Sequence, residues 1–331
     1  KSHPGSSFKP FASAEAFKKG YPDSTILFDV KTEFNPSCTP DGNSLKDSYG
    51  IDCYNPQNYD GRFRGPVTLR NSLAQSLNVT SVKTLYLAGI ENTINLAESM
   101  GITTLKDRSR FGLSLVLGGA EVRLVDLVSA YGVFANDGVK NPWYFIKKVE
   151  TNTGEILEEH IPEPKRVLDS SVARLINDIL SDNNARSPVF GYSNSLYIPE
   201  REVAAKTGTT QENRDAWVIG YTPTVTTGVW TGNNNNKSMT KEGAGISASG
   251  PLWHEFMVSA LQKMPIENFT EPDPVFSDKP MLNGQYQPEI HNILYYVDIL
   301  NPKGPIPSDP RNDSQFNNWE WAGRSYLGLP L

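Results

Sequence analysis

The hydrophobic pattern of this chain changes its period near residue 200, and this change limits the folds that the chain can form. Between residues 66 and 183 apolar residues recur three and four positions apart, which predicts a series of amphipathic helices. Between residues 202 and 232 turn signals separate segments rich in Val, Thr and Trp, which predicts strands and a hairpin. The predicted helices are 66–76, 79–89, 91–101, 120–138, 169–183 and 250–263, and the predicted strands are 202–210, 215–222 and 224–232.

The N-terminal residues predict one more helix. Residues 6–19 have helical periodicity and are followed by Gly20, which favours a helix end there. Pro10 falls close enough to the first turn for its missing N–H to cost little. Ser6 would therefore lie near the N-terminus of this helix.

Two long segments lack clear periodicity. Residues 21–65 are rich in turn formers and aromatic residues, which predicts a long ordered loop. Residues 264–331 are rich in Pro and Asn. We therefore expect one domain over residues 1–263 and a C-terminal extension over 264–331, which wraps the surface or tethers another module.

Length and charge exclude some functions. The chain has 331 residues and a formal net charge of -6, so it offers no broad basic surface for nucleic acid or an anionic membrane. No apolar stretch approaches the roughly 20 residues that a membrane span needs. The chain begins with Lys1 rather than Met, which indicates a piece of a longer protein with any export or anchoring segment upstream.

The two cysteines, Cys38 and Cys53, lie in a turn-rich segment. In an oxidising compartment a disulfide between them would contribute about 3 kcal/mol of stability. Two free thiols are an equally good interpretation of the sequence. The chain contains no Cys and His spacing that is typical of a zinc site.

A possible nucleophile and its base stand close together at the start of the chain. On a helix Ser6 and Lys9 share a face, and a desolvated lysine can accept the proton that makes a serine hydroxyl reactive. The pattern S-x-x-K is weak by itself, because chance produces about one or two matches in a chain of this length. A second match does occur at Ser238 to Lys241, in a loop that fixes no geometry.

The sequence KTGTT, residues 206–210, is a sharper signal. Gly208 leaves room for an extended ligand beside a strand, and Lys206, Thr207 and Thr209 can receive a carboxylate. A polar edge strand whose lysine discourages aggregation is the structural alternative. Taken together, S-x-x-K, S-x-N and K-T-G are the motif set of penicillin-binding proteins and serine β-lactamases.

Two segments could supply the S-x-N member. Ser181 to Asn183 is a literal S-D-N, but Ser181 lies near the end of a predicted helix, where its hydroxyl would bind terminal backbone groups. Ser76 and Asn78 lie at a break between two predicted helices, where both side chains can face a cleft. We therefore prefer Ser76 and Asn78.

With these motifs in this order, the chain resembles the transpeptidase domain of class A, bifunctional penicillin-binding proteins. The blocks PGSSFKPF, VTLRNSLAQSLNV, VSAYGVFANDG and KTGTTQENRDAWVIGYTP carry the resemblance, which spans about residues 4–262. It implies a mixed α+β fold of the penicillin-binding-protein and serine β-lactamase type, in which helices flank an antiparallel sheet beside a helical subdomain. It also implies that the S-x-N element lies in the second block, in agreement with Ser76 and Asn78.

The resemblance implies a D,D-transpeptidase that cross-links peptidoglycan stem peptides ending in D-Ala-D-Ala through an acyl-enzyme and that β-lactams inhibit. Ser6 would be the nucleophile, Lys9 its base, and Ser76 a proton relay beside Lys206. No metal or organic cofactor is expected.

The resemblance also implies the residues that bind substrate. Asn78 would hold the substrate amide, while Thr207, Gly208 and Thr209 would bind along its carboxylate end. The backbone N–H groups of Ser6 and Thr209 would form the oxyanion hole, where such donors are typically worth about 3 kcal/mol each.

This chain departs from the family in two ways. The family places two strands ahead of the S-x-x-K helix, whereas only five residues precede Ser6. The glycosyltransferase domain and the membrane anchor are also missing, so both are expected upstream in the full protein. The domain would then work at the extracytoplasmic face of a bacterial membrane.

Three other functions fit the same motifs. A D,D-carboxypeptidase differs in accepting water instead of an amine. A β-lactamase needs a further base, usually a glutamate, and no convincing E-x-x-L-N-like loop is found. A module that keeps the fold without turnover would serve in β-lactam sensing or as a scaffold.

Overall fold

The centre of the molecule is an antiparallel three-stranded sheet. The structure is a computed structural model that describes residues 1–240, 245–287, 289 and 291–331. The strand order is β7 (Ala204–Thr209), β8 (Asp215–Tyr221) and β9 (Thr226–Gly232), which confirms the three predicted strands and their turns. Within the described ranges, β7 and β9 each pair with β8 alone.

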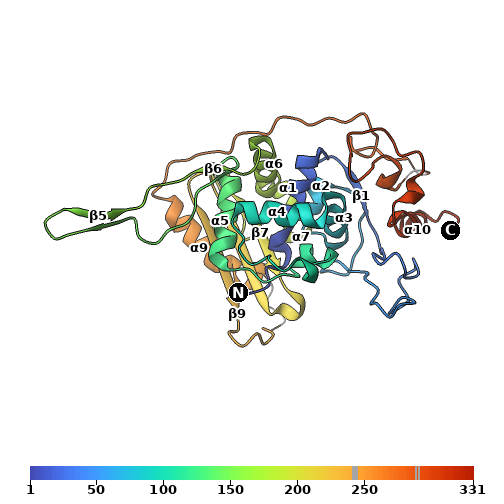
Figure 1. Cartoon of the computed structure of the whole chain (residues 1–331), viewed down its shortest axis with the longest axis horizontal. Coiled ribbons are helices and arrows are strands. Elements are labelled where there is room, and N and C mark those ends of the chain that lie inside the picture. The colour runs from blue at the N-terminus through green and yellow to red at the C-terminus, as the bar shows by residue number, and fades with distance from the viewer. Residues whose placement is uncertain (241–244, 288, 290) are drawn as a thin grey trace.

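Helices cover both faces of this sheet (Figure 1). Alternate residues of β8 point to opposite sides, so Ile219 joins the large helical core while Val218 joins a smaller core with Trp253. The larger layer comprises α1 (Lys9–Lys19), α2 (Leu69–Ala74), α3 (Asn78–Ala88), α4 (Ile90–Met100), α5 (Leu124–Ala135), α6 (Ser170–Ser181) and α7 (Asn183–Phe190). The opposite layer comprises α8 (Gly245–Ala248) and α9 (Gly250–Leu261).

The N-terminal helix differs in detail from its prediction. It ends at Gly20 as predicted, because this glycine adopts the left-handed conformation with φ of 102°. Its start, however, is a 3-10 turn, η1 (Gly5–Phe8), and the α-helix begins at Lys9. Ser6 therefore lies on a tight turn ahead of α1, where residues three apart still share a face.

The prediction of an unbroken loop over 21–65 and of a helix from residue 66 is wrong at both ends. Two short strands, β1 (Ile26–Asp29) and β2 (Gly65–Thr68), pair antiparallel, and α2 starts only after Thr68. The partners are far apart in sequence, so neither strand is marked by a local turn. Further short elements are η2 (Arg108–Arg110), η3 (Leu113–Leu117), β3 (Val139–Lys140), β6 (Lys165–Arg166) and η4 (Gln211–Asn213).

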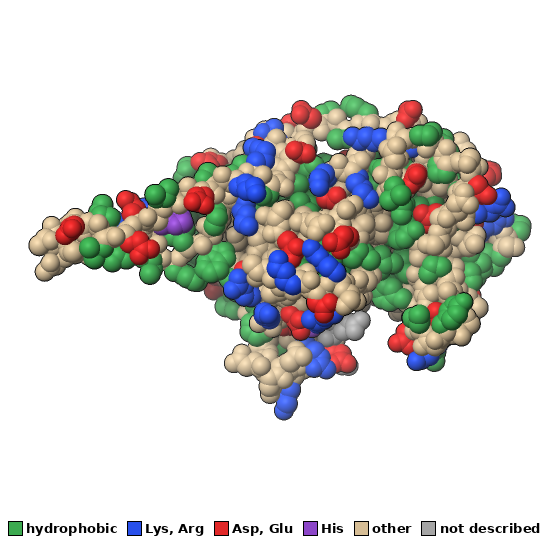
Figure 2. Space-filling model, in the orientation of Figure 1, with side chains coloured by type: hydrophobic (Ala, Val, Ile, Leu, Met, Phe, Trp, Pro, Cys, Tyr) green, Lys and Arg blue, Asp and Glu red, His purple; other side chains and the backbone are tan. Residues whose placement is uncertain are grey.

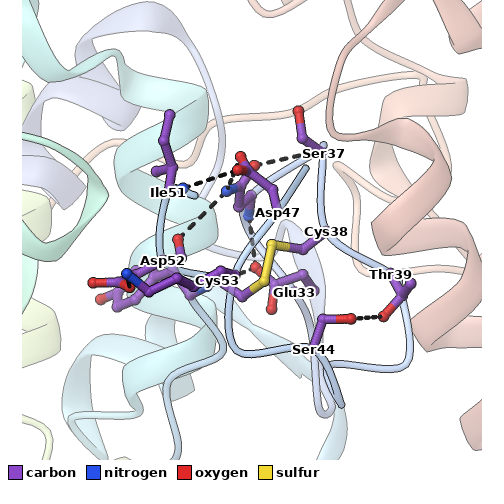
Figure 3. The surroundings of a disulfide bond; sticks show 12 residues. Glu33, Ser37, Cys38, Thr39, Ser44, Asp47, Ile51, Asp52 and Cys53 are labelled. Atoms are coloured by element: carbon purple, nitrogen blue, oxygen red, sulfur yellow. Dashed lines mark hydrogen bonds and ion pairs between the residues drawn. A yellow bond between two sulfur atoms is a disulfide. The ribbon is translucent and has the colours of Figure 1, made fainter. Parts of the chain in front are cut away.

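The long connection between β1 and β2 is held by a disulfide and by one buried acid. Cys38 and Cys53 are bonded to each other (Figure 3). Beside them, the carboxylate of Glu33 accepts the backbone N–H of Asn35 at 2.8 Å and that of Tyr54 at 2.7 Å. These contacts order a segment that has little regular structure.

The C-terminal residues return across the molecule. An extended stretch after α9 leads to a compact part that contains η5 (Ile293–Tyr295), η6 (Pro310–Asn312) and α10 (Phe316–Leu327), beside β1 (Figure 1). The amide of Gln315 donates to the carbonyl of Phe34 at 2.9 Å. The extension thus covers the β1 end of the helical layer.

A hairpin projects from the body of the molecule. Its strands are β4 (Lys148–Glu150) and β5 (Ile156–Glu159), and all of their residues are exposed. Hydrophobic side chains lie on its surface among charged ones (Figure 2). Among the described helices none is both long enough and apolar enough to cross a bilayer.

Candidate active site

Ser76 occupies a strained position between α2 and α3. Its φ of 61° lies in the left-handed region, which is unfavourable for a serine and is kept only when the surroundings fix it. The backbone N–H of Ser76 donates to Leu73 at 3.1 Å, and that of Leu77 donates to Ser72 at 3.0 Å. The break between two helices that the sequence predicts is therefore a tight turn.

This turn is surrounded by two buried lysines. Lys206 Nζ donates to the Ser76 hydroxyl at 2.7 Å. Lys9 Nζ donates to the Ser76 carbonyl at 2.6 Å and to Asn78 Oδ1 at 2.8 Å, and it lies 3.5 Å from the Ser76 hydroxyl. The Ser76 hydroxyl thus lies between two amines that are far apart in the sequence.

Burial lowers the pKa of both lysine side chains. Lys9 is 1% exposed, and its burial together with the nearby charge of Lys206 holds its pKa well below the ordinary lysine value. Burial and the charge of Arg186 lower the pKa of Lys206 to about 7. Lys206 can therefore gain or lose a proton near neutral pH.

Arg186 is a neighbour that no sequence motif indicated. It lies on α7, is 2% exposed, and one of its terminal nitrogens donates to the Leu180 carbonyl. Its other terminal nitrogen, Nη1, has no hydrogen-bond partner among the described residues. Burial lowers its pKa to about 10, so it still carries a positive charge at neutral pH.

The turn that carries Ser6 is pressed against β7. A side chain on Gly5, whose φ is 54°, would lie 2.5 Å from the carbonyl oxygen of Thr209. A side chain on Gly208 would lie 2.2 Å from the carbonyl oxygen of Pro4. The space that a Gly208 side chain would occupy is therefore filled by this turn, so the glycine is needed here for the close approach of the two backbones.

Ser6 itself is half-buried, and its hydroxyl is not among the described hydrogen-bond partners of the Lys9 amine. Lys9, one turn later, directs its amine to the Ser76 turn instead. The structure therefore brings Lys9, Ser76, Asn78 and Lys206 into direct contact, and it places Ser6 beside β7 without a bond to Lys9.

Among the described residues no strand pairs with the outer edge of β7. The backbone N–H of Thr210 donates to Asp215 on β8 at 3.1 Å, and successive residues of a strand alternate the side to which their N–H groups point. The N–H groups of Thr207 and Thr209 therefore point to the outer edge. The hydroxyl of Thr209 accepts the backbone N–H of Gly245 at 2.9 Å.

Asn78 has two further hydrogen-bond partners besides Lys9. Its backbone N–H donates to Asn58 Oδ1 at 2.7 Å, and its amide nitrogen donates to the carbonyl of Gln57 at 2.8 Å. Asn58 in turn donates to Asp29 on β1. Sequence reasoning missed Asn58 and Asp29, because they lie in the segment that it treated as a loop.

The other motif matches lie elsewhere. The Ser181 hydroxyl donates to the carbonyl of Asp178 at 3.2 Å, which is the helix-end role that the sequence suggested as its simplest explanation. Asp182 accepts the backbone N–H of Ala185 and caps α7. The second S-x-x-K ends at Lys241, which lies outside the described residues.

Two further features are separate from this cluster. A cavity of about 460 Å³ lies beside the N-terminus and β8, where Lys1, Trp217 and Trp230 line it, and none of the eight candidate residues does. Glu33 gathers with Cys38 and Cys53, but the two sulfurs are bonded to each other and so offer no thiolate to a metal (Figure 3).

Comparison with known proteins places this chain in one family. The family model of the penicillin binding protein transpeptidase domain matches residues 1–258. The chain therefore belongs to the transpeptidase domains of penicillin-binding proteins. Its curated relatives are class A proteins, as the resemblance of the four sequence blocks implied.

Two of these relatives are penicillin-binding proteins 1A. The protein of Aquifex aeolicus is 36% identical over 271 residues, which are 81% of this chain and 34% of that protein. The protein of Neisseria lactamica is 30% identical over 313 residues, which are 93% of this chain and 37% of that protein. The chain thus spans little more than a third of the length of these relatives.

Solved structures confirm the mixed α+β fold. Penicillin-binding protein 1A of Haemophilus influenzae matches with a TM-score of 0.70 and 25% identity, over 86% of this chain and 46% of that one. PonA1 of Mycobacterium tuberculosis in complex with penicillin V matches with a TM-score of 0.64 and 27% identity, over 82% of this chain and 73% of that one.

Proposed function

We propose that this chain is a D,D-transpeptidase domain that cross-links peptidoglycan stem peptides ending in D-Ala-D-Ala. The observation that carries the proposal is the Ser76 hydroxyl between the amines of Lys9 and Lys206. A hydroxyl between two buried amines of lowered pKa can pass a proton in either direction, as acyl transfer through a serine requires.

Ser6 is the proposed nucleophile. Its oxygen attacks the carbonyl of the penultimate D-Ala, and its proton passes to neutral Lys9. The base role requires that the Lys9 amine reach Ser6 when substrate is bound, and catalytic hydrogen bonds commonly tighten at that stage. The N–H groups of Ser6 and Thr209 stabilise the oxyanion.

Ser76 acts as the proton donor when the terminal D-Ala leaves. The Ser76 hydroxyl gives its proton to the amine of the terminal D-Ala and regains one from the lysine pair. An ester on Ser6 remains. The amine of a second stem peptide then attacks this ester, loses its extra proton by the same route, and Ser6 recovers its hydroxyl proton. These steps need no metal or organic cofactor.

Substrate lies along the outer edge of β7 in this proposal. Asn78 holds the peptide amide, and Thr207 and Thr209 receive the terminal carboxylate beside Lys206. A β-lactam presents a similar amide and carboxylate, so it acylates Ser6 and inhibits the domain. PonA1, a similar protein, was solved with penicillin V. The domain would act outside the bacterial cytoplasmic membrane, together with a glycosyltransferase domain of the full protein.

Labelled penicillin followed by mass mapping of the peptides tests the proposal. The expected result is a stable adduct on the peptide that contains Ser6, which disappears in Ser6→Ala. Rapid turnover of the drug would instead indicate a β-lactamase. A correctly folded protein without an adduct would overturn the acyl-enzyme proposal and favour a non-catalytic module. Release of D-Ala with and without an amine acceptor separates transpeptidase from carboxypeptidase.

A further inference from the structure

The left-handed Ser76 turn is held from outside by the side chain of Asn58. The Asn58 carbonyl oxygen, Oδ1, accepts the backbone N–H of Asn78 at 2.7 Å. Asn78 is the first residue of α3, and the residue before it provides no side-chain cap. Asn58 therefore satisfies one of the N–H groups that a helix start leaves without a partner. In doing so it fixes the residue two positions after Ser76.

A buried acid fixes the orientation of Asn58. Asn58 is 5% exposed, and its amide nitrogen lies 2.9 and 2.8 Å from the two carboxylate oxygens of Asp29, which is 0% exposed. The backbone N–H of Asn78 can only donate a hydrogen bond, so the amide oxygen of Asn58 must face Asn78 and its amide nitrogen must face Asp29. The amide nitrogen also donates to the carbonyl of Arg62 at 2.8 Å.

Strand β1, which carries Asp29, is itself anchored to α3. Lys83 of α3 is 2% exposed and donates to the carbonyl of Phe28 at 2.9 Å. The same ammonium group lies 5.1 Å from the ring centre of Trp319 on α10. Strand β1 therefore contacts α3 at two places. Asp29 acts through Asn58 at the start of α3, and Phe28 accepts the hydrogen bond of Lys83 further along the helix.

We propose that Asp29 and Asn58 are positioning residues, which hold Asn78 and the Ser76 turn where both Lys9 and Lys206 can reach them. The catalytic meaning of this inference rests on the proposed function. The proposed effect on the position of Ser76 does not depend on that function, because the contact between Lys206 and Ser76 exists before any substrate binds. Loss of Asn58 frees the turn to relax from its strained conformation and withdraws the Ser76 hydroxyl from Lys206.

Two variants with matched chemistry test this role. Asn58→Leu removes the hydrogen bond between the Asn58 side chain and the Asn78 N–H. Asn318→Leu is the control, because Asn318 is also buried and donates to the carbonyls of Glu33 and Asn35 in the same connection, at 3.1 and 3.2 Å. We expect Asn58→Leu to lower the penicillin acylation rate per folded molecule by about tenfold, and Asn318→Leu to lower the melting temperature without this loss. Asp29→Asn should have little further effect in the Asn58→Leu background.

A readout without β-lactam keeps the test independent of the proposed function. Carbon-13 labelling of the lysine side chains allows NMR titration of Lys206, which is assigned with Lys206→Met and distinguished from Lys83 with Lys83→Met. The Ser76 hydroxyl accepts a hydrogen bond from Lys206 and so favours its charged form. We expect Asn58→Leu to move the Lys206 midpoint to lower pH, and Asn318→Leu to leave it in place.

The outcomes separate the two proposals. An unchanged Lys206 midpoint and acylation rate in Asn58→Leu would overturn the positioning role while leaving the transpeptidase proposal intact. Equal effects of both variants would also overturn it, because they would show general destabilisation. A lowered midpoint in a protein that penicillin does not acylate would support the positioning role and count against the proposed function.

Discussion

Two serines of this chain stand two residues before an asparagine, and the fold uses them differently. Ser76 lies in a left-handed turn between α2 and α3, and its hydroxyl binds Lys206 at 2.7 Å. Ser181 lies in the last turn of α6, and its hydroxyl binds the Asp178 carbonyl at 3.2 Å. The serine of the literal S-D-N thus binds the backbone of its own helix, whereas the serine of the looser S-L-N lies beside two buried amines.

The difference shows that backbone geometry and burial, rather than the S-x-N pattern alone, decide which serine lies beside the two lysines. A helix turn directs the serine hydroxyl back to its own backbone. The left-handed conformation of Ser76 releases its hydroxyl from the helix, and the surrounding residues maintain this conformation. Four predictions test the comparison, in order of decreasing effect.

The largest effect should follow from removing the proposed base. We expect Lys9→Met to lower the penicillin acylation rate about a thousandfold, which is within the range of general-base contributions. The variant should fold, because it removes a buried amine whose charged form is disfavoured. Stopped acylation in a protein that has lost its melting transition would not count as support. Near-normal acylation by folded Lys9→Met would assign the base elsewhere.

The paired serine variants compare the two regions directly. Ser76→Ala should lower the acylation rate about a hundredfold through loss of the proton relay, whereas Ser181→Ala should leave it unchanged. The adduct mass measured over time gives both rates. Equal rates in the two variants would remove the distinction between the regions.

The Ser181 region should matter for stability. Asp182 accepts the backbone N–H of Ala185 at 2.8 Å and pairs with Arg70 at 3.1 Å. We expect Asp182→Ala to lower the free energy of unfolding by about 1 kcal/mol, measured by denaturant titration. The acylation rate of the folded variant should match that of the unaltered chain. A large loss of acylation would show that this region contributes to the site.

The smallest expected effect is a shift in the titration midpoint of Lys206. The positive charge of Arg186 disfavours protonated Lys206 and lowers its pKa, so Arg186→Met should raise the Lys206 titration midpoint from about 7. At pH 7 the variant would then hold more charged Lys206. The exposed Arg311, in the C-terminal extension, provides the control Arg311→Met. A midpoint that stays constant or falls in Arg186→Met would contradict this electrostatic account.

The sequence predicts the parts of the fold that local patterns encode. The three central strands are joined by short turns, and α1 ends at a glycine, so both are visible in the periodicity. Strands β1 and β2 are not, because each depends on a partner about forty residues away, and β2 contains Pro66. A proline in a strand pattern favours a different assignment.

The sequence likewise predicts some residues of the candidate site and misses others. The motifs indicate Lys9, Ser76 and Lys206, which the structure brings into contact. Asn58 and Arg186 belong to no motif, and their importance depends on burial next to groups far away in the sequence. The segment that carries Asn58 follows a disulfide whose formation the sequence left open.

The central claim is that Ser6 is acylated beside a Ser76 hydroxyl shared by two lysines. A crystal structure of the penicillin adduct tests it most directly. The account predicts an ester on Ser6 whose carbonyl oxygen accepts the N–H groups of Ser6 and Thr209, with the Ser76 hydroxyl still bound to Lys206. An ester on another residue, or a Ser76 hydroxyl turned away from both amines, would contradict it.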